Sequence, residues 1–406
     1  METKKILVTA TTFPTFLKGD VTPPFVYELS KRLAKNKDLK IVVSTPYIKR
    51  AKTYKEREGM KIYRYKYGFT SLCDGAILPN LKKNKLLYFQ IPFFLIASFF
   101  NLRKLVKEEK IDIIHAHWII PQGFIAVLYK KLFRKKNLKI ICTSHGGDIF
   151  GLQNPFMKKI KRWTLNNVDR LTVVSNAIKE EVKKLDARDN LPIEVVPMGV
   201  DAELFNPDKY DSKIKEKYGI EGSFLLFVGR LAEKKGVKYL IDAMPAVIQE
   251  HPKTKLLIVG SGSLENELKK QIKNLNLEND VIFTGAIPNN ELPSYYATAD
   301  IFIGPSIIAK GGDAEGFGLV FVEALMSKTC VITSDFKAIS DIIKNEDTGI
   351  QIDVRNQKIF SEKIIKLIDN AKERKRLVEN GYNFVKDNFT WDIITDKYRN
   401  LIDKMI

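Results

Sequence analysis

The chain has 406 residues, of which 45% are hydrophobic and 28% charged, and its formal net charge is +19. This length exceeds what one hydrophobic core usually supports, so two domains are expected. The lysines are spread along the chain without a basic stripe of interleaved aromatic residues, which argues against nucleic acid as a partner. The charge then indicates a solvated basic surface, an anionic membrane surface or an anionic ligand.

Short apolar runs alternate with helical stretches in the first half of the chain. The run at 4–10 is too short for a signal peptide, and 25–37 is typical of a helix. Short β-branched runs separated by helices indicate parallel strands joined by crossover helices. The strands predicted in this half are 4–10, 39–46, 111–117, 138–145, 170–175 and 193–199.

The same pattern restarts after the polar segment Asn206-Pro207-Asp208. Two successive series predict an α/β fold of two doubly wound domains. The expected domains are 1–205, completed by a last helix at 389–406, and 206–388. The strands predicted in the second series are 223–230, 254–262, 280–288, 300–306 and 328–335.

One apolar segment, from Leu86 to Leu102, is interrupted by Gln90 and Pro92 and falls short of the roughly 20 residues of a membrane-spanning helix. Lysines and arginines flank it on both sides. It therefore has two interpretations, a helix lying in a membrane interface or a buried helix of the N-terminal domain. The three cysteines, Cys73, Cys142 and Cys330, lie too far apart for a metal site or a disulfide framework, which favours a reducing cytosolic compartment.

Polar and glycine residues gather where the predicted strands end. Ligands of doubly wound sheets bind beyond the carboxyl ends of the strands, and a cleft between domains is a common place for a small-molecule site. We therefore expect one cleft between two domains. The segments expected to line it are 12–20, 117, 145–148, 229–230, 260–262 and the residues from 304 onward.

A pair of cations follows the strand predicted at 223–230. Arg230 stands at the strand end, and Lys235 stands five residues on, at the entry to a helix. Two cations beside the free N–H groups of a helix N-terminus fit a diphosphate and can neutralise charge on a departing phosphate. The alternative is a solvated basic turn.

Two glutamates flank a glycine-rich stretch about 80 residues further on. Glu315 precedes the stretch, and Glu323 lies about one turn inside the helix that follows. A carboxylate in the loop can accept hydrogen bonds from sugar hydroxyls, and one in the helix can hold a ribose diol. The alternative is a glutamate that interacts with the helix dipole beside a solvated one.

Histidine is rare in the chain, with four residues. His145 ends a predicted strand and is followed by Gly146-Gly147-Asp148, so it is a candidate site residue. His117 is a weaker candidate, because it can equally be a structural residue beside Trp118. His115 is expected in a core, and His251 on the surface.

These stretches together resemble the large retaining glycosyltransferase family 4, which has the GT-B fold of two facing Rossmann-like domains. FVGRLAEKKG, IVGSGSLENEL and EGFGLVFVEA resemble its nucleotide-sugar-binding half, and VVPMGVDAELFNP resembles its interdomain signature. DIIHAHWIIPQG and TSHGGDI resemble its acceptor-side loops. The similarity extends from about Phe13 to Trp391.

The resemblance implies a role for each matching residue. Arg230 and Lys235 would hold the donor diphosphate, Glu323 the ribose and Glu315 the transferred sugar, and His145 would lie near the reacting carbon. The remaining expected contacts are Gly19, Gly262, Ile287, Phe317, Gly318 and Leu319 on the donor side, and His117 and Asp148 on the acceptor side.

The sequence departs from the family pattern in three places. Lys18-Gly19-Asp20 stands where two adjacent glycines are usual. The stretch SKTCVITSD lacks the usual Gly-x-Pro, and 335–339 lacks the usual paired glycines. These departures leave the donor sugar open.

The resemblance implies transfer of a hexosyl group from a UDP- or GDP-sugar to an acceptor hydroxyl with retention of configuration. No Asp-x-Asp motif ends a strand, so neither a metal nor another cofactor is expected. A glycan or lipid-linked acceptor in glycolipid or surface polysaccharide synthesis is expected, with the enzyme cytoplasmic or peripheral on an anionic inner membrane face. The alternatives are a soluble small acceptor, a phosphorylase or nucleotide-sugar epimerase of the same fold, and a non-catalytic scaffold.

Overall fold

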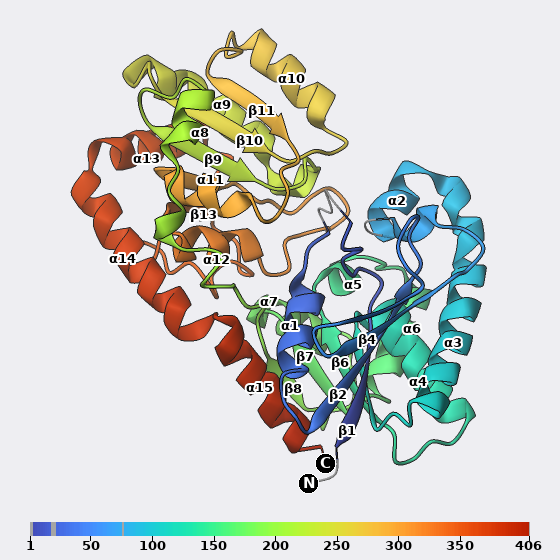
Figure 1. Ribbon diagram of the computed structural model, residues 1–406. Coiled ribbons are helices and arrows are strands. Elements are labelled where there is room, and N and C mark those ends of the chain that lie inside the picture. The colour runs from blue at the N-terminus through green and yellow to red at the C-terminus, as the bar shows by residue number, and fades with distance from the viewer. Residues whose placement is uncertain (1–2, 18–21, 75–76, 406) are drawn as a thin grey trace. The chain divides into compact units, whose positions relative to one another are not determined.

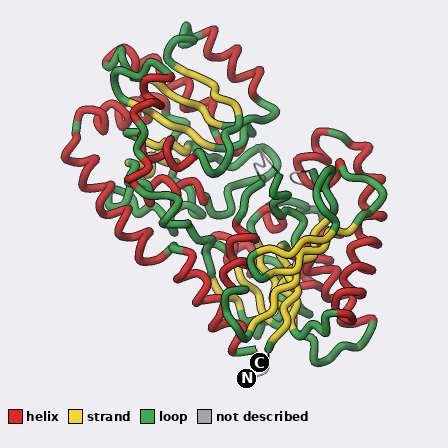
Figure 2. The backbone as a smooth tube through the Cα atoms, in the orientation of Figure 1, coloured by secondary structure: helices red, strands yellow, loops and turns green. Residues whose placement is uncertain are grey.

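The computed structural model describes residues 3–17, 22–74 and 77–405. The chain forms two compact units, unit 1 from Met1–Pro197 with Ile394–Ile406, and unit 2 from Met198–Ile393. These divisions differ by eight residues (197 against 205) and five residues (393 against 388) from the domain limits expected from sequence. In each unit the strands form one sheet flanked by helices (Figure 2).

Within the described residues, the sheet of unit 1 has eight strands in the order β3-β4-β2-β1-β5-β6-β7-β8. All neighbours pair in parallel except β3 and β4, which form an antiparallel hairpin. The order reverses between β1 and β5, so the loops after these two strands diverge. The strands are β1 Lys4–Thr9, β2 Leu39–Pro46, β3 Tyr54–Arg57, β4 Met60–Tyr65, β5 Ile113–His117, β6 Lys139–Ser144, β7 Arg170–Val173 and β8 Ile193–Val195.

Helices cover both faces of this sheet, with α3, α4 and α6 on one side and α1 and α15 on the other (Figure 1). The predicted helix 25–37 ends earlier, at Leu33, because the polar residues after it form a turn in which Leu39 N donates to Asn36 O. The helices are α1 Phe25–Leu33, α2 Ile77–Lys83, α3 Gln90–Glu108, α4 Phe124–Leu132, α5 Gly147–Phe150, α6 Pro155–Leu165, α7 Asn176–Lys183 and α15 Trp391–Asp403.

The apolar segment from Leu86 to Leu102 lies in a short helical turn, Lys85–Phe89, and in the helix α3 that follows it. Phe94, Leu102 and Leu105 of α3 are buried, whereas Phe93 and Phe100 are exposed. By length and composition, Lys85–Glu108 is the one helical segment of the described residues that is long and apolar enough to cross a membrane. The helix is thus buried on one face only.

Within the part of unit 2 that the structure describes, the sheet has six parallel strands in the order β11-β10-β9-β12-β13-β14. The order reverses between β9 and β12. The strands are β9 Phe224–Val228, β10 Lys255–Val259, β11 Val281–Gly285, β12 Ile301–Gly304, β13 Cys330–Ser334 and β14 Ile350–Ile352. The helices are α8 Ser212–Lys217, α9 Val237–Glu250, α10 Glu265–Asn274, α11 Leu292–Thr298, α12 Leu319–Met326, α13 Gln357–Asp369 and α14 Ala371–Asn388.

The core of unit 2 explains why its strands can be predicted from the sequence. β9 and β13 are buried along their whole length, because helices cover both faces of a parallel sheet. Leu225, Ile258 and Ile303 from three neighbouring strands belong to one apolar cluster with residues of α9 and α13. Together the two sheets confirm the predicted α/β fold of two doubly wound, Rossmann-like domains.

Candidate functional site

The first candidate site lies in unit 2, where the loops after β9 and β12 leave the reversal point of the sheet. Such a point is the usual ligand crevice of an open α/β sheet. Arg230 follows β9, and Lys235 ends a short helical turn, Glu233–Lys235, before α9. The Lys235 Nζ lies 2.5 Å from Glu315 Oε2, with both side chains largely buried. The structure thus pairs two expected site residues that lie 80 positions apart.

A second set of contacts fixes the loop between β12 and α12 against the loop after β9. Lys234 Nζ donates to Asp313 Oδ1 at 3.1 Å and to the carbonyl of Ala314 at 3.2 Å. The backbone N–H of Ile307 donates to the Lys234 carbonyl at 2.8 Å. The part of the loop that precedes Glu315 is therefore held against the loop after β9.

Two glycines permit this close approach of backbone to backbone. Gly236 has φ +65°, and a Cβ there would lie 1.8 Å from the Pro305 carbonyl oxygen. Gly260 has φ +138°, and a Cβ there would lie 1.9 Å from the Gly229 carbonyl oxygen. Any larger residue at either position would force the loops apart.

The end of β13 also supports the loop after β12, in the stretch that lacks the family's Gly-x-Pro. Thr333 Oγ1 donates to the Gly304 carbonyl at 2.9 Å, and Ser334 Oγ donates to the Ser306 carbonyl. In the following loop, Ile339 is fully buried. The departure at 327–335 therefore lies next to the loop that carries Glu315.

The charges at this site act on Glu315 in opposite directions. Burial raises the pKa of its carboxyl, but Lys235, Lys234 and Arg230 outweigh burial and hold the pKa at about 2. Arg230 is exposed and forms no ion pair with the described residues. The site therefore holds a fixed carboxylate beside a cationic cluster, with the Arg230 guanidinium available to an anion.

Glu323 lies in the first turns of α12, which begins after Gly318 at φ +91°. The hydroxyl of buried Tyr296 donates to Glu323 Oε2 at 3.0 Å. Burial raises the pKa of the Glu323 carboxyl to about 7, although Tyr296 and Lys235 both lower it. Tyr296, on α11, was not predicted from the sequence, where the pair Tyr295-Tyr296 carries no sign of its partner.

The other expected donor residues have different surroundings. Phe317 is buried, and its ring packs against Phe389 at 6.0 Å between centroids. Gly262 packs closely on the Leu231 backbone. Ile287 follows β11, which is separated from β9 by β10. Leu319 is the first residue of α12, and Gly19, with Lys18 and Asp20, lies outside the described residues.

The second candidate site lies in unit 1, at the ends of β5 and β6. His117 Nδ1 and His145 Nε2 are 2.9 Å apart and share one hydrogen bond. The half-buried His145 ring also packs against Phe25 and Trp118, at 4.8 and 5.1 Å between centroids. His115 is buried, as expected, and bonds Thr143 Oγ1 at 2.8 Å.

Burial keeps both members of the histidine pair neutral at physiological pH. It lowers the pKa of His145 to about 3 and that of His117 well below its usual range. In a neutral pair one ring donates and the other accepts, so one of the two remaining nitrogens carries a proton and the other a lone pair. Those nitrogens, His117 Nε2 and His145 Nδ1, have no partner among the described residues. The pair therefore has one donor and one acceptor nitrogen without a partner among the described residues, and both nitrogens are buried.

Asp148 is 3% exposed, and both carboxylate oxygens have partners. Oδ2 accepts from the backbone N–H of Ile119 at 2.7 Å, and Oδ1 accepts from Ser144 Oγ at 2.8 Å. Burial raises the pKa of its carboxyl despite these bonds. Asp148 thus holds the turn after Trp118, whose φ is +74°, and its expected contact with an acceptor stays a prediction.

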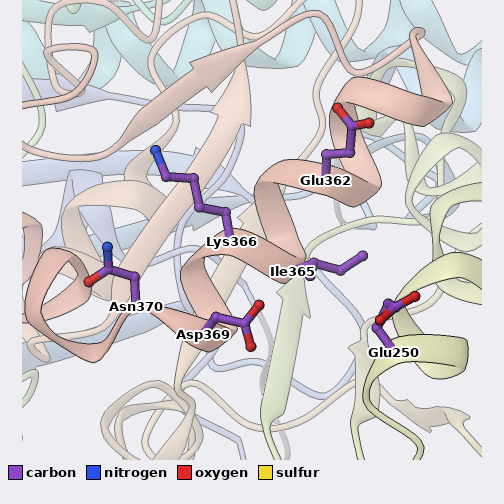
Figure 3. A pocket seen from close by; sticks show the side chains of 6 residues that line it. All are labelled: Glu250, Glu362, Ile365, Lys366, Asp369 and Asn370. Carbon is purple, nitrogen blue, oxygen red and sulfur yellow. The ribbon is translucent and has the colours of Figure 1, made fainter.

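A shallow surface hollow on unit 2 is separate from these residues. Figure 3 shows it on α13 and at the end of α9, and none of the expected site residues lines it. Over residues 3–17, 22–74 and 77–405, no group of three or more His, Cys, Asp or Glu side chains is arranged to hold a metal ion. The lining residues of the hollow are Glu250, Glu362, Ile365, Lys366, Asp369 and Asn370.

Both halves of the chain match families of glycosyltransferases. Residues 211–384 match the model of glycosyl transferases group 1, and residues 24–204 match that of glycosyltransferase family 4. The N-acetyl-alpha-D-glucosaminyl L-malate synthase of Bacillus anthracis is 26% identical over 78% of this chain and 81% of its own.

Two further proteins extend the likeness. The GDP-mannose-dependent alpha-(1-6)-phosphatidylinositol monomannoside mannosyltransferase of Mycobacterium tuberculosis is 24% identical over 74% of this chain and 78% of its own. The crystal structure of Anabaena HepE in complex with UDP-glucose has a TM-score of 0.75 at 16% identity, covering 98% of this chain and 99% of that one. The two family models and the shared fold show that this chain belongs to glycosyltransferase family 4, of the GT-B type.

Proposed function

We propose that the chain transfers a hexosyl group from a nucleoside diphosphate sugar to an acceptor hydroxyl, with retention of configuration and without a divalent metal or other cofactor. The observation that carries this proposal is the cationic cluster of Arg230, Lys234 and Lys235 around Glu315 at the reversal point of the unit 2 sheet. A cluster of this kind fits the diphosphate of a donor.

The donor-binding roles follow from the charges. Lys235 is neutralised by Glu315 in this structure, and a bound diphosphate would give it a second anionic partner. Glu315 would then be free to accept hydrogen bonds from hydroxyls of the transferred sugar. Glu323, whose position is fixed by Tyr296, would accept from the ribose diol.

The positive charge that aids departure would come from side chains. Arg230 and Lys235 would stabilise the negative charge that develops on the leaving diphosphate. In a retaining transfer with attack on the face that the leaving group departs from, the departing phosphate itself accepts the proton of the acceptor hydroxyl. Glu315 would orient the donor and would not act as a nucleophile.

The names of two similar proteins support a UDP- or GDP-sugar as donor and a lipid-linked acceptor. The mycobacterial relative is named for GDP-mannose and for a phosphatidylinositol monomannoside, and HepE is bound to UDP-glucose. We therefore propose a UDP- or GDP-sugar donor and a glycan or lipid-linked acceptor in glycolipid or surface polysaccharide synthesis. The enzyme would act in the cytoplasm, peripherally on the inner face of the membrane.

Stereochemistry tests the proposal without knowledge of the acceptor. The purified chain is incubated with each UDP- and GDP-hexose in the presence of EDTA, and proton NMR follows the anomer released by transfer to water. We expect one donor to release a sugar with the donor's own anomeric configuration first. Lys235→Ala should abolish release, and Lys253→Ala, on an exposed ion pair of unit 2, should not. Release of the opposite anomer, or release that requires magnesium, would overturn the proposal.

A further inference from the structure

The helix α3 carries apolar residues on two opposite faces. On one face, the ring of Phe94 packs against Tyr67 at 5.7 Å between centroids. On the other, Phe93 is 55% exposed, Ile96 57% and Phe100 56%, and Phe89, the last residue of the turn before α3, is 77% exposed. Spacings of four, three and four residues place these four side chains along one stripe. A helix at the surface of a soluble domain normally has polar residues there.

The stripe continues onto the two neighbouring helices, which lie beside α3 on the same side of the sheet (Figure 1). Phe99 of α3 stacks on Phe133 at the end of α4, at 6.3 Å between centroids, and Phe124 of α4 packs on Trp163 of α6 at 5.6 Å. The apolar surface so formed is defined by its most exposed members, Phe89, Phe93, Ile96, Phe100, Leu132 and Phe156.

The charges around the apolar surface are almost all positive. The segments 124–140 and 155–165, which contain α4 and α6, include ten lysines and arginines and no aspartate or glutamate. Of these ten, Lys161 is buried and Lys130 is paired with Asp169. On α3, Arg103, Lys104 and Lys107 follow the apolar stripe, and Lys85 precedes it. A second copy of the chain would bring the same positive charge against this surface, whereas an anionic lipid surface complements it.

We propose that the apolar surface docks unit 1 on an anionic phospholipid bilayer, with α3 lying in the headgroup region. The opposite face of α3 is packed into the core of unit 1, so the helix lies along the bilayer and does not cross it. The inference deepens the proposed function, which places the enzyme on the inner face of the membrane, by naming the surface that docks. Vesicle binding requires neither a donor nor transfer, so the two proposals can fail separately.

The topology gives this docking a direction. The helix α3 returns the chain from the carboxyl end of β4 to the amino end of β5, and these strands point the same way in the sheet. Its apolar first half therefore lies toward the carboxyl edge of the sheet, the edge at which His117 and His145 stand. Because α3 runs antiparallel to the strands and lies along the bilayer, docking places this side of the sheet, and not one edge of it, against the membrane.

Flotation with vesicles tests the proposal on the full chain. One set of vesicles contains phosphatidylcholine alone, and the other contains phosphatidylcholine and phosphatidylglycerol in equal parts. We expect the chain to float with the second set at low salt and to bind about fivefold more weakly for each lysine replaced by glutamine among Lys131, Lys135 and Lys136. Binding should also weaken as salt is added.

Substitution of the stripe separates the apolar from the electrostatic contribution. Phe93→Ser, Ile96→Ser and Phe100→Ser together should weaken vesicle binding at least about a hundredfold. The matched control replaces Tyr210 and Ile359, exposed apolar residues of unit 2, by serine and should bind like the original chain. Equal thermal midpoints of the three proteins show that the variants fold.

Trp163 provides a reporter at the apolar surface. Its fluorescence should shift to the blue on anionic vesicles, and the shift should be absent in Trp163→Phe. Three results would overturn the proposal: no flotation with anionic vesicles, flotation that the triple serine variant retains, or a lipid-free dimer that the triple variant abolishes. The last result would assign the apolar surface to a second copy of the chain.

Discussion

The carboxyl of Glu323 provides a quantitative test of the donor site, because burial raises its pKa from the usual 4.5 to about 7. Replacing Glu323 by glutamine removes the ionisation and keeps an oxygen that can accept from Tyr296. A raised carboxyl pKa means that the ionised form is disfavoured in the folded state. The stability of the folded chain should therefore fall as the pH rises from about 4.5 to about 7.

The magnitude follows from the shift of roughly 2.5 pH units. At about 1.4 kcal/mol per unit, ionised Glu323 lowers the free energy of unfolding by up to about 3 kcal/mol above pH 7. We expect Glu323→Gln to raise the urea midpoint above pH 7 and to leave it nearly unchanged below pH 4.5. Glu362→Gln, at an exposed position on α13, is the matched control.

Nucleotide binding should respond to the same ionisation. If the ribose diol donates to the Glu323 carboxylate, affinity for the cognate nucleoside diphosphate rises with pH through about 7, and Glu323→Gln removes this rise. Tyr296→Phe deletes a bond that lowers the pKa, so it should move the rise to higher pH. Calorimetric titrations across this range measure both effects. A Glu323→Gln variant with the pH profile of the original chain would refute the reasoning.

Three further predictions follow from the same contacts. The lowered pKa of Glu315 contributes stability that is present above pH 4.5 and lost toward pH 2. Glu315→Gln should therefore lower the free energy of unfolding at neutral pH by up to about 3 kcal/mol, measured in urea, and this loss should shrink as the pH falls. Gly236→Ala places a Cβ against the Pro305 carbonyl, so it should destabilise the chain and weaken nucleotide binding measured by calorimetry. Its control is Gly219→Ala, where φ is a similar +61° but the space is open, and this change should lower the free energy of unfolding by only about 1 kcal/mol. Asp148→Ala leaves two buried donors unpaired, so it should lower the free energy of unfolding by about 2 kcal/mol and reduce the thermal midpoint. Nucleotide affinity should not change.

Much of the fold could be predicted from the sequence, because buried parallel strands are continuous apolar runs. The runs at 223–230 and 328–335 contain β9 and β13, which are buried throughout. The strands β3, β4 and β14 were not predicted. β4, with the sequence MKIYRY, interrupts its apolar residues with basic ones, so it forms no continuous apolar run. β3 is an exposed edge strand, so its sequence has no apolar run, and β14 has three residues.

The candidate site could be predicted only in part from the sequence. Arg230 and Lys235 follow a strand end, so topology alone indicates their neighbourhood. By contrast, the partners of Tyr296 and of Asp148 depend on packing between elements distant in sequence, which no local pattern records. The double-faced character of α3 is similar, because the sequence shows that both faces are apolar but not which one the core covers.

The most direct test of the central claim is nucleotide binding at the reversal point of the unit 2 sheet. UDP, GDP and ADP are titrated calorimetrically into the original chain and into the Arg230→Ala, Lys235→Ala double variant, each with magnesium and with EDTA. We predict that one nucleotide binds equally well under both conditions and that the double variant loses this binding. A folded chain that binds none of the three, or a double variant that binds as tightly as the original, would contradict the claim.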